Sequence, residues 1–387
     1  MNFFEFDIRK TGDFTILVGA IVASIAFVME LTLLPLMLGA IQEDFGLNVG
    51  ELSWVFNAYA LAIALAVITG GIIGDMVNKQ ILFSIGVSLF AVGSILATLS
   101  GDLQSLIVSR TIQGVGGGLF SPLIPILLTQ SESRRSGKIL MIWGGLAGVA
   151  ATSLPVFGNY ILTSLGWRAI FYAFAIVSVL AVILVAFGDD RSEIEIRRGI
   201  PGLQKLKSLT RIRFIVFYIF LTYGCFTFFL FYFPIQLQSN GTSTQLISLF
   251  FVCVWATFSV LSFALKDRID GPGLQLCLSA APILLALSFV TGILLSDNFA
   301  MQIMSAVLAG AGLASSNSTS THLLLRMSPP DLRVFASSLD IIFARCGGVI
   351  TVALLSDIVP NQALLAIITL SILALVCSQG FVSLERK

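Results

Sequence analysis

The stretch of residues 81–96, ILFSIGVSLFAVGSIL, decides the fold class of this chain. It contains no charged residue and places apolar side chains on every face of a helix. A strand of a membrane β-barrel is about 10 residues long and alternates polar with apolar side chains. A transmembrane helix needs about 20 mostly apolar residues, because each residue adds about 1.5 Å to the axis and the hydrocarbon core is about 30 Å thick. The stretch therefore predicts a membrane-spanning helix.

The composition of the whole chain supports the same reading. Of 387 residues, 57% are hydrophobic and only 11% are charged, whereas a soluble domain has about 25% charged residues. This excludes an ordinary soluble enzyme, a disordered chain and a coiled coil. The net charge of +1 provides no overall field that would attract nucleic acid. We expect the lipid bilayer to be the main environment and no nucleic-acid partner.

Twelve segments of the chain have the length and hydropathy of a membrane span. They cover residues 14–41, 52–74, 81–100, 103–129, 138–164, 168–187, 213–237, 243–265, 274–295, 299–325, 332–356 and 361–382. The first segment is too long for the core of a signal peptide, and no small-residue cleavage site follows it, so we expect it to be retained. The sequence predicts an all-α integral membrane protein with twelve transmembrane helices.

The positions of lysine and arginine predict the orientation in the membrane. Of the 22 Lys and Arg residues, Arg168 lies in one set of alternate loops, and Arg110 and Arg345 lie inside predicted spans. The remaining 19 all lie in the other set of loops or at the two chain ends. Basic residues accumulate in cytoplasmic loops of membrane proteins. We therefore expect both termini to face the cytoplasm.

One long polar break divides the chain into two halves. Residues 189–213 contain seven basic residues and the helix-breaking sequence Ile200-Pro201-Gly202. The predicted units are a first six-helix bundle over residues 1–187, a cytoplasmic basic linker over 188–212 and a second bundle over 213–387. Two pseudo-repeated bundles around a central cavity are typical of secondary transporters. A channel, a receptor or a membrane enzyme is the alternative.

The residues that an enzyme or a metal site would need are scarce. The chain has one histidine, and its five cysteines lie in apolar runs without the spacing of metal ligands. No nucleophile elbow is present either. The sequence therefore predicts no metal site and no enzymatic activity.

The loop after the second span carries the first family motif. Residues 71–80, GIIGDMVNKQ, resemble the cytoplasmic loop signature of the major facilitator superfamily, Gly-x-Leu-(Ala/Gly)-Asp-Arg-x-Gly-(Arg/Lys)-(Arg/Lys). Gly71, Asp75 and Lys79 fit this signature, as do Ile73 and Gly74. Met76, Asn78 and Gln80 depart from it. The resemblance assigns Gly71, Asp75 and Lys79 to a loop that latches conformational change.

Two further motifs imply proton coupling. Residues 106–118, LIVSRTIQGVGGG, resemble the Arg-x-x-Gln-Gly-x-Gly signature of proton-coupled members of the superfamily. An arginine within a span costs at least about 2.5–3.5 kcal/mol, so Arg110 needs an acidic partner or a wet cavity, unless it reaches to the outer interface. Residues 29–32, MELT, resemble the Leu-Asp-x-Thr motif of the drug:proton antiporter branch. The resemblance implies that Glu30 and Arg110 form a direct or water-bridged proton-coupling pair.

The fifth span resembles the antiporter signature, which ends Gly-Pro-x-x-Gly-Gly. It reads GGLAG over residues 144–148 and LPVFGN over 154–159. The resemblance assigns Gly148, Pro155 and Gly158 to helix packing and conformational change in an exporter. Residues 166–171, GWRAIF, resemble the family's Trp-Arg-x-x-Phe entry to the sixth span. Residues 53–59, SWVFNAY, are another family-like stretch, and Asn57 within it is a candidate for substrate contact.

Other candidates for substrate contact come from the spans that line the cavity in this fold. The tenth span carries the polar run SSNSTSTH over residues 315–322, from which we select Asn317 as a residue that lines the cavity. The alternative is that the serine and threonine hydroxyls of this run bond back to their own helix. The seventh span contributes Tyr223. In the eleventh span we expect Arg345 to face the cavity and bind an acid or an anionic substrate group. A structural pair of Arg345 with Asp340 is the alternative.

The resemblance as a whole implies a proton-coupled secondary active exporter of small organic molecules that works by alternating access. The alternative is a dedicated exporter of an endogenous polar metabolite such as a siderophore. The expected partners are protons, a small-molecule substrate and the bilayer, with no cofactor because the proton gradient supplies the energy. We expect a monomer in the plasma membrane, specifically a bacterial inner membrane. A part for Asp340 and His322 in coupling stays open.

Overall fold

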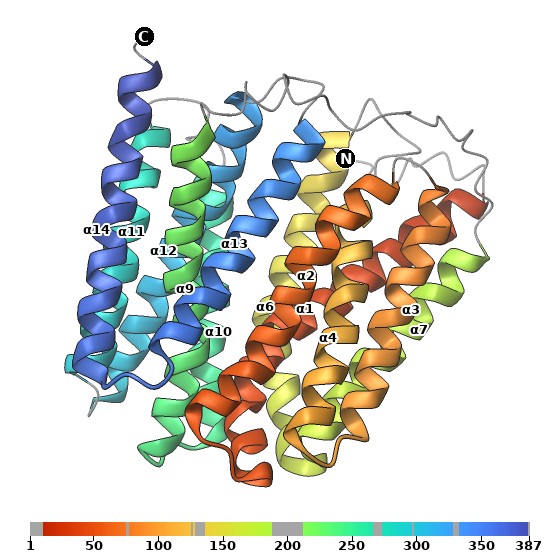
Figure 1. Ribbon diagram of the computed structural model, residues 1–387, viewed down its shortest axis with the longest axis horizontal. Coiled ribbons are helices and arrows are strands. Elements are labelled where there is room, and N and C mark those ends of the chain that lie inside the picture. Colours follow the sequence, from red (N-terminus) through yellow and green to blue (C-terminus); the bar gives the residue numbers. More distant parts are fainter. Residues whose placement is uncertain are drawn as a thin grey trace, which may run out of the picture.

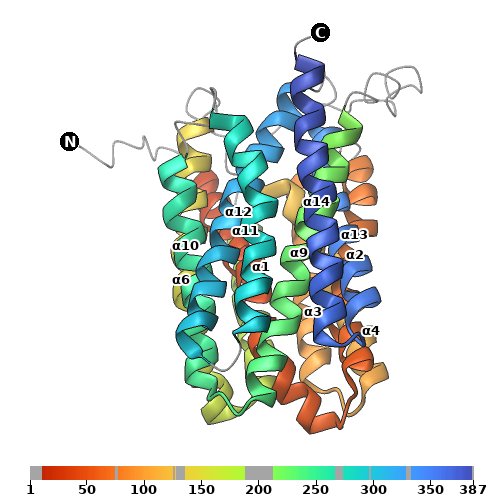
Figure 2. The ribbon, with the colours of Figure 1, turned by 90° about the vertical axis from the view of Figure 1, so that its left-hand side faces the viewer.

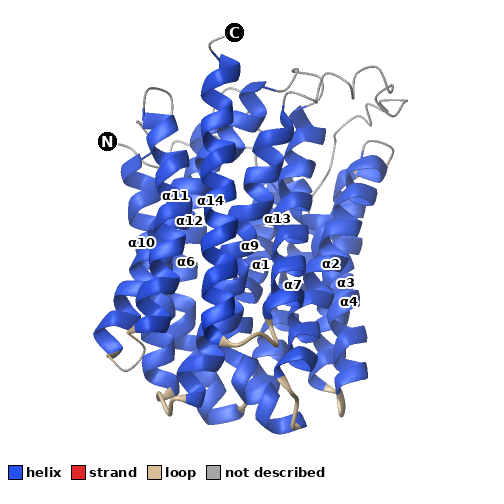
Figure 3. Ribbon diagram, turned by 60° about the vertical axis from the view of Figure 1, so that its left-hand side comes forward, coloured by secondary structure: helices blue, strands red, loops and turns tan. Residues whose placement is uncertain are grey.

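The computed structural model describes residues 11–74, 77–124, 127, 136–187, 212–265, 273–295, 298–327 and 333–385. Within these ranges the chain forms α-helices, one short 3₁₀ turn and no strand (Figure 3). The helices are α1 (Thr11–Phe45), α2 (Val49–Gly74), α3 (Lys79–Thr98), α4 (Leu103–Phe120), α6 (Ser136–Leu165), α7 (Trp167–Ala186), α9 (Arg213–Ser239), α10 (Thr244–Leu265), α11 (Gly273–Leu294), α12 (Phe299–Met327), α13 (Arg333–Leu355) and α14 (Pro360–Glu385). The predicted all-α, twelve-helix fold is confirmed.

The helices run side by side along one common direction, as in a membrane protein (Figure 1). Ten of the twelve described helices, all but α4 and α6, are long and apolar enough to cross a bilayer. α4 is only 18 residues long and contains Arg110, Gln113 and a run of glycines. In the predicted fourth span, 103–129, α4 is followed by the 3₁₀ turn Ser121–Leu123, which contains Pro122. Ile124 and Leu127 beyond the turn are again helical, and the other residues after Ile124 lie outside the described part of the chain.

The first helix is longer than its apolar sequence predicts. The expected span was 14–41, but α1 continues through Glu43 and Asp44 to Phe45. Gly46 then adopts a φ of 64°, a left-handed conformation that glycine reaches without steric cost and that commonly ends helices. α1 therefore extends past the apolar segment into the polar region.

The bundle has two distinct ends (Figure 2). At the short-loop end, the connections that are described in full are residues 46–48, 99–102, 166, 240–243 and 356–359. At the terminal end, α1 begins and α14 ends. The predicted linker, residues 188–212, lies outside the described residues except for Ile212. The placement of the termini on the cytoplasmic side stays a prediction.

The helices form two six-helix bundles that contact each other. In the first bundle, α4 packs on α2 and α3, and α7 packs on α1 and α3. In the second, α12 packs on α10 and α11, and α9 packs on α13 and α14. Between the bundles, α2 contacts α13, α6 contacts α10, and α1 contacts α9. The interface between the bundles is therefore lined by α1, α2 and α6 on one side and by α9, α10 and α13 on the other.

Candidate transport site

Solvent reaches α1 along only part of its length. Between residues 15 and 31, half-buried side chains alternate with buried ones, whereas all residues from 32 to 39 are buried. α1 is surrounded by α2, α6, α7, α9 and α10, so its accessible face borders the space between the bundles. The accessible part of α1 ends near Leu31, and the residues that follow are buried.

Near the short-loop end, the two bundles contact each other directly. Gln238 on α9 donates a hydrogen bond from Nε2 to Oε1 of Glu43 on α1, at 2.5 Å. The rings of Phe56 on α2 and Phe231 on α9 meet edge to face, with centroids 5.8 Å apart. All four residues lie in the half of their helices nearest the short-loop end. These contacts join the two bundles near the short-loop end.

A buried ion pair lies just beside the end of the accessible face. The Nη2 atom of Arg110 on α4 is 2.5 Å from Oε1 of Glu30 on α1. The Arg110 side chain has 0% and the Glu30 side chain 4% of its surface exposed. Arg110 therefore points into the protein, and the alternative of an arginine that reaches to the membrane interface is wrong.

The remaining polar groups of Arg110 also have partners. Its Nε atom donates to the backbone oxygen of Val55 on α2 at 3.2 Å, and Nη1 donates to Oε1 of Gln113 one turn along α4. The guanidinium carbon lies 4.4 Å from the ring centroid of Tyr59, within the range of a cation–π interaction. A buried charge is tolerated when it is paired and hydrogen-bonded, and Arg110 meets both conditions.

Gln113 connects this pair to α3. Its Nε2 atom donates to the Oγ of Ser94 at 3.0 Å, and both side chains are buried. The two helices approach closely here because Gly93 has no side chain: a Cβ atom added to it would lie 2.4 Å from the backbone nitrogen of Gln113. Gly93 and Ser94 hold Gln113, and Gln113 in turn helps to hold Arg110.

A second polar cluster lies in the other bundle. The hydroxyl of Tyr223 on α9 donates to Oδ1 of Asn317 on α12. Thr321, one turn further along α12, donates to Oδ2 of Asp340 on α13 at 2.5 Å. The Oδ1 atom of Asp340 is buried and has no hydrogen-bond partner among the described residues. The structure thus brings together two of the candidate substrate residues, Tyr223 and Asn317.

Arg345 lies on α13 near the same cluster and reaches toward the first bundle. Its guanidinium carbon is 5.6 Å from the ring centroid of Phe27 on α1. Asp340 is bonded to Thr321, and the described residues show no ion pair between Asp340 and Arg345. The alternative of a structural Asp340–Arg345 pair is therefore not what the structure shows, in keeping with the poor i,i+5 geometry.

The polar run of α12 combines both arrangements considered from the sequence. The hydroxyls of Thr319 and Ser320 donate to carbonyl groups of their own helix, while Asn317 and Thr321 bond to other helices. His322 is half-buried, and a part for it in coupling stays open. Asn57 is buried, and its Oδ1 atom has no partner in the described part of the chain.

The residues of the antiporter-like signature lie where helices meet. The backbone oxygen of Pro155 accepts a hydrogen bond from Ser248 Oγ at 2.6 Å, and that of Gly148 accepts one from Ser259 Oγ at 3.2 Å. Both serines belong to α10 of the other bundle. A Cβ atom on Gly158 would lie 2.3 Å from a methyl carbon of Leu33 on α1. The two serines were not found from the sequence.

The conformational loop joins α2 to α3. Gly71 lies in the last turn of α2, and Asp75 lies outside the described residues. Lys79 begins α3 and is exposed. Asn78 precedes it and caps the helix, because its Oδ1 atom accepts a hydrogen bond from the backbone nitrogen of Ile81 at 3.0 Å. Asn78 therefore starts α3 at the position where the family signature has glycine.

A comparison with protein families decides the assignment. The family model described as Major Facilitator Superfamily matches residues 17–353. The chain belongs to the major facilitator superfamily. The ten helices that are long and apolar enough to cross a bilayer agree with this membership.

Relatives with curated names match part of this facilitator. The tetracenomycin C resistance and export protein of Streptomyces glaucescens is 30% identical over 168 residues, 43% of this chain and 31% of that protein. The riboflavin transporter RibZ of Clostridioides difficile is 33% identical over 145 residues, 37% of this chain and 32% of that protein. The multidrug transporter protein MdtP of Bacillus subtilis is 27% identical over 174 residues, 45% of this chain and 32% of that protein. These alignments cover about a third of each relative.

Solved structures support the fold over nearly the whole chain. A POT family transporter in complex with a thioalcohol-conjugated peptide superimposes with a TM-score of 0.77 at 14% identity and covers 97% of this chain and 96% of that one. A D-xylose–proton symporter also gives a TM-score of 0.77 at 14% identity and covers 95% of this chain and 96% of that one. At this identity the likeness shows the fold alone.

The single basic residue at the short-loop end of the facilitator has a structural partner. Arg168 donates from Nη1 to Oδ2 of Asp44 at 2.7 Å and from Nη2 to the backbone oxygen of Ser100 at 3.1 Å. Its guanidinium carbon lies 4.2 Å from the ring centroid of Trp167. Arg168 thus ties the start of α7 to the end of α1 and to the α3–α4 connection, which accounts for a base in a set of loops otherwise without them.

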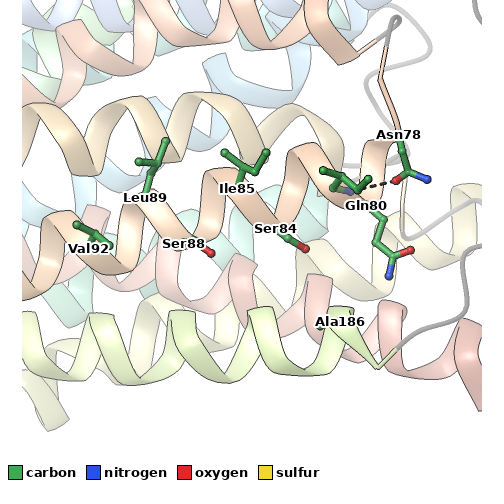
Figure 4. Close-up of a pocket in the computed structure, with 9 residues that line it drawn as sticks. Asn78, Gln80, Ser84, Ile85, Ser88, Leu89, Val92 and Ala186 are labelled. Carbon is green, nitrogen blue, oxygen red and sulfur yellow. Dashed lines mark hydrogen bonds between the residues drawn. The ribbon is translucent and has the colours of Figure 1, made fainter.

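A groove of about 630 Å³ lies away from the candidate site. It runs along α3 near the terminal end, where Ser84, Ile85, Ser88 and Leu89 line it and Ala186 of α7 borders it (Figure 4). Ile85 is 49% exposed, so the groove faces outward from the bundle. We do not assign the groove to the transport path, because it is not lined by any charged residue or by any of the substrate candidates.

Proposed function

We propose that this facilitator is a proton-coupled exporter of small organic molecules that works by alternating access. The observation that carries the proposal is the buried Glu30–Arg110 pair, 2.5 Å apart, at the inner limit of the accessible face of α1. The names of its relatives from Streptomyces glaucescens and Bacillus subtilis, an export protein and a multidrug transporter, support export. The relative named a riboflavin transporter does not indicate a direction of transport.

Glu30 is the group that would carry the proton. As a carboxylate it neutralises Arg110, and protonation of Glu30 removes that negative charge while Arg110 keeps its bonds to Val55 and Gln113. The ion pair between α1 and α4 is then replaced by a weaker contact between a neutral acid and a cation. A proton that enters with a membrane potential of 100 mV supplies about 2.3 kcal/mol, which drives a modest gradient of substrate.

We place the short-loop end outside the cell and the terminal end in the cytoplasm, because 19 of the 22 basic residues are in loops and chain ends on the terminal side. The accessible face of α1 then opens to the cytoplasm, and substrate enters from the cytoplasm or the inner leaflet. In this proposal the facilitator works as a monomer without a resident cofactor, in a bacterial inner membrane.

A second function has its own supporting observation. The cluster of Tyr223, Asn317, Thr321 and Asp340 is more polar than a pocket for purely apolar drugs requires. It favours a dedicated exporter of one endogenous polar metabolite, such as a siderophore. A deletion strain separates the two functions: sensitivity to many unrelated dyes supports multidrug export, whereas failure to secrete one metabolite supports the dedicated exporter.

Proteoliposomes with an imposed pH gradient test the proposed coupling. We expect the native protein to accumulate at least one compound from a panel of cationic, neutral and anionic dyes against its gradient. Glu30→Gln keeps the size of the side chain but cannot take up a proton, so it should abolish accumulation driven by pH while exchange of labelled for unlabelled dye continues. Glu51→Gln is the matched control, since Glu51 is exposed at the start of α2 and bonds to the backbone of Asn48.

The result that contradicts the assignment is specific. If Glu30→Gln accumulates dye with the same dependence on pH as the native protein, Glu30 is not the coupling group. A native protein that lets dye equilibrate but never concentrates it would be a channel, and the proposal of an antiporter would be wrong.

A further inference from the structure

Arg345 is a cation near the middle of a membrane-spanning helix. It lies 12 residues from the start and 10 from the end of α13, which is about 18 Å and about 15 Å along the helix axis. Among the described residues its guanidinium has neither a hydrogen-bond nor an ion-pair partner, and its neighbour is the ring of Phe27. Arg110, by contrast, has an acceptor for each of its nitrogen atoms.

The nearest acid on the same helix does not neutralise Arg345. Asp340 accepts the hydroxyl of Thr321 at 2.5 Å, and residues five apart on a helix do not face each other. A charged side chain in a span is almost always paired or exposed to a water-filled cavity. Since Arg345 is half-buried and reaches toward α1, it is exposed to the space between the bundles.

A second group of donors lies beside it. The Oδ1 atom of Asn317 accepts the hydroxyl of Tyr223, which leaves the two N–H bonds of its amide group as donors. The described residues offer no acceptor for them. A Cβ atom on Gly224 of α9 would lie 3.1 Å from the backbone oxygen of Gly347 on α13, so the helix segments that carry Tyr223 and Arg345 pack against each other. In the described part of the chain, neither the guanidinium of Arg345 nor the amide N–H bonds of Asn317 have an acceptor, and the Oδ1 atom of Asp340 in the same cluster is also without a partner. An anionic group between Arg345 and Asn317 would supply the acceptors that these donors lack.

The same site has aromatic walls. Phe27 and Tyr223 are half-buried, so each presents part of its ring to the space between the bundles. Phe27 lies within the accessible part of α1, and Tyr223 is on α9 in the opposite bundle. An aromatic ring of a ligand can stack between two such walls, and an aromatic pair contributes about 0.5–1.5 kcal/mol beyond the burial of its area.

We propose that Arg345 and Asn317 bind the anionic group of the transported substrate, and that the substrates are small organic anions with a flat aromatic body. A carboxylate supplies two oxygens to the planar fork of a guanidinium, and Tyr223 orients the amide of Asn317 to donate to the same group. The proposal rests on the proposed function, because it names the substrate class of the same transport site.

Binding to the purified full chain in detergent, with no gradient, tests the proposal. The probes are pyrenebutyrate, its methyl ester and pyrenebutylammonium, which share one aromatic body and differ in charge. The fluorescence of the pyrene reports binding at neutral pH. We expect the anion to bind about tenfold more tightly than the ester and the ammonium to bind most weakly. Equal affinities, or a preference for the ammonium, would overturn the proposal.

Variants assign the preference to Arg345. Arg345→Gln should lower the affinity for pyrenebutyrate to that for the ester. Arg345→Lys keeps the charge but not the planar fork, so it should keep the preference for the anion with a weaker affinity. Arg213→Gln is the control, because this exposed arginine at the start of α9 is also changed by one charge and should leave the three affinities unaltered. An unchanged preference in Arg345→Gln would refute the assignment.

The outcome can be separated from a failure of the proposed function. Glu30→Gln removes the proposed coupling group and leaves Arg345 in place, so it should still prefer the anion. If the anion is preferred but no pH-driven accumulation is found in proteoliposomes, the antiport proposal is wrong and the anion site stands. If accumulation is driven by pH and the anion is not preferred, the antiport proposal stands and the anion site is wrong. Thermal unfolding of each variant confirms that it is folded.

Discussion

Replacement of Gly93 by alanine tests whether the packing of α3 on α4 holds the proton site. Gly93 faces Gln113, whose side chain accepts a hydrogen bond from Arg110 and donates one to Ser94. The Cβ atom of an alanine at position 93 would lie 2.4 Å from the nitrogen of Gln113 and 2.7 Å from its Cα and Cβ atoms. None of these atoms belongs to the far end of a flexible side chain, so the two helices must move apart.

The expected cost follows from these distances. Ordinary contact begins at 3.4 Å, so the helices must separate locally by about 1 Å, the difference between 3.4 and 2.4 Å. Overpacking of this kind costs about 1–3 kcal/mol. Because the added Cβ atom would meet the backbone of Gln113, which cannot rotate away, we expect Gly93→Ala to lie near the upper limit. The higher helix propensity of alanine returns about 1 kcal/mol. We expect the free energy of unfolding to fall by about 2 kcal/mol.

Thermal unfolding and denaturant titration of the purified protein measure this change, and proteoliposome flux measures its effect on coupling. Gly101→Ala is the control in the connection between the same two helices, where an added Cβ atom meets nothing within 4 Å. Because alanine restricts the unfolded chain, Gly101→Ala should raise the free energy of unfolding by about 0.4–1 kcal/mol. If Gly93→Ala is as stable as Gly101→Ala, and its pH-driven transport is intact, the packing argument is refuted.

Two further changes test contacts at the interfaces of the helices. Ser248→Ala removes the buried hydrogen bond to the backbone oxygen of Pro155 between the bundles and should lower the free energy of unfolding by about 1 kcal/mol. Ser288→Ala removes a hydrogen bond within one helix and should lower the free energy of unfolding by less. Equal losses for the two variants in denaturant titrations would contradict this prediction. Arg168→Gln breaks the ion pair with Asp44, whose two side chains are about 40% exposed. The free energy of unfolding should therefore fall by at most about 1 kcal/mol, and the difference should be smaller at high salt. A melting-temperature difference that is the same at low and high salt would show that packing, not charge, is what Arg168 contributes.

The parts of the site that could be predicted from the sequence are those in which burial of a charge leaves few choices. Glu30 and Arg110 are charged residues in separate spans, and a charge in a span needs a partner. Their direct contact at 2.5 Å follows from this requirement together with the family motifs that contain them. The helices themselves were predictable for a similar reason, since long apolar segments have only one common way to satisfy their backbone in lipid.

The parts that could not be predicted depend on neutral groups and on helix ends. Ser248 is one of many serines, and a hydroxyl in a helix can bond to its own backbone at little cost, so nothing in the sequence marks it as a contact to Pro155. The partner of Asp340 was missed for the same reason, because Thr321 is a neutral residue on another helix. The 3₁₀ turn Ser121–Leu123, which contains Pro122, lies inside an apolar segment whose hydropathy does not show where such a turn occurs.

The arginine inside a span of the first bundle and the arginine inside a span of the second differ in their hydrogen-bond partners, and this difference gives the two proposals a common physical basis. Arg110 is saturated by its own bundle, so only a change in the charge of Glu30 alters it. Arg345 has no acceptor among the described residues and faces Phe27. Phe27 and Glu30 are three residues apart on α1, on neighbouring positions of one helix face. A displacement of α1 when Glu30 gains or loses its proton therefore also moves Phe27, the ring beside which Arg345 would hold an anion. In this way α1 can couple the proton site to the substrate site without direct contact between the two arginines.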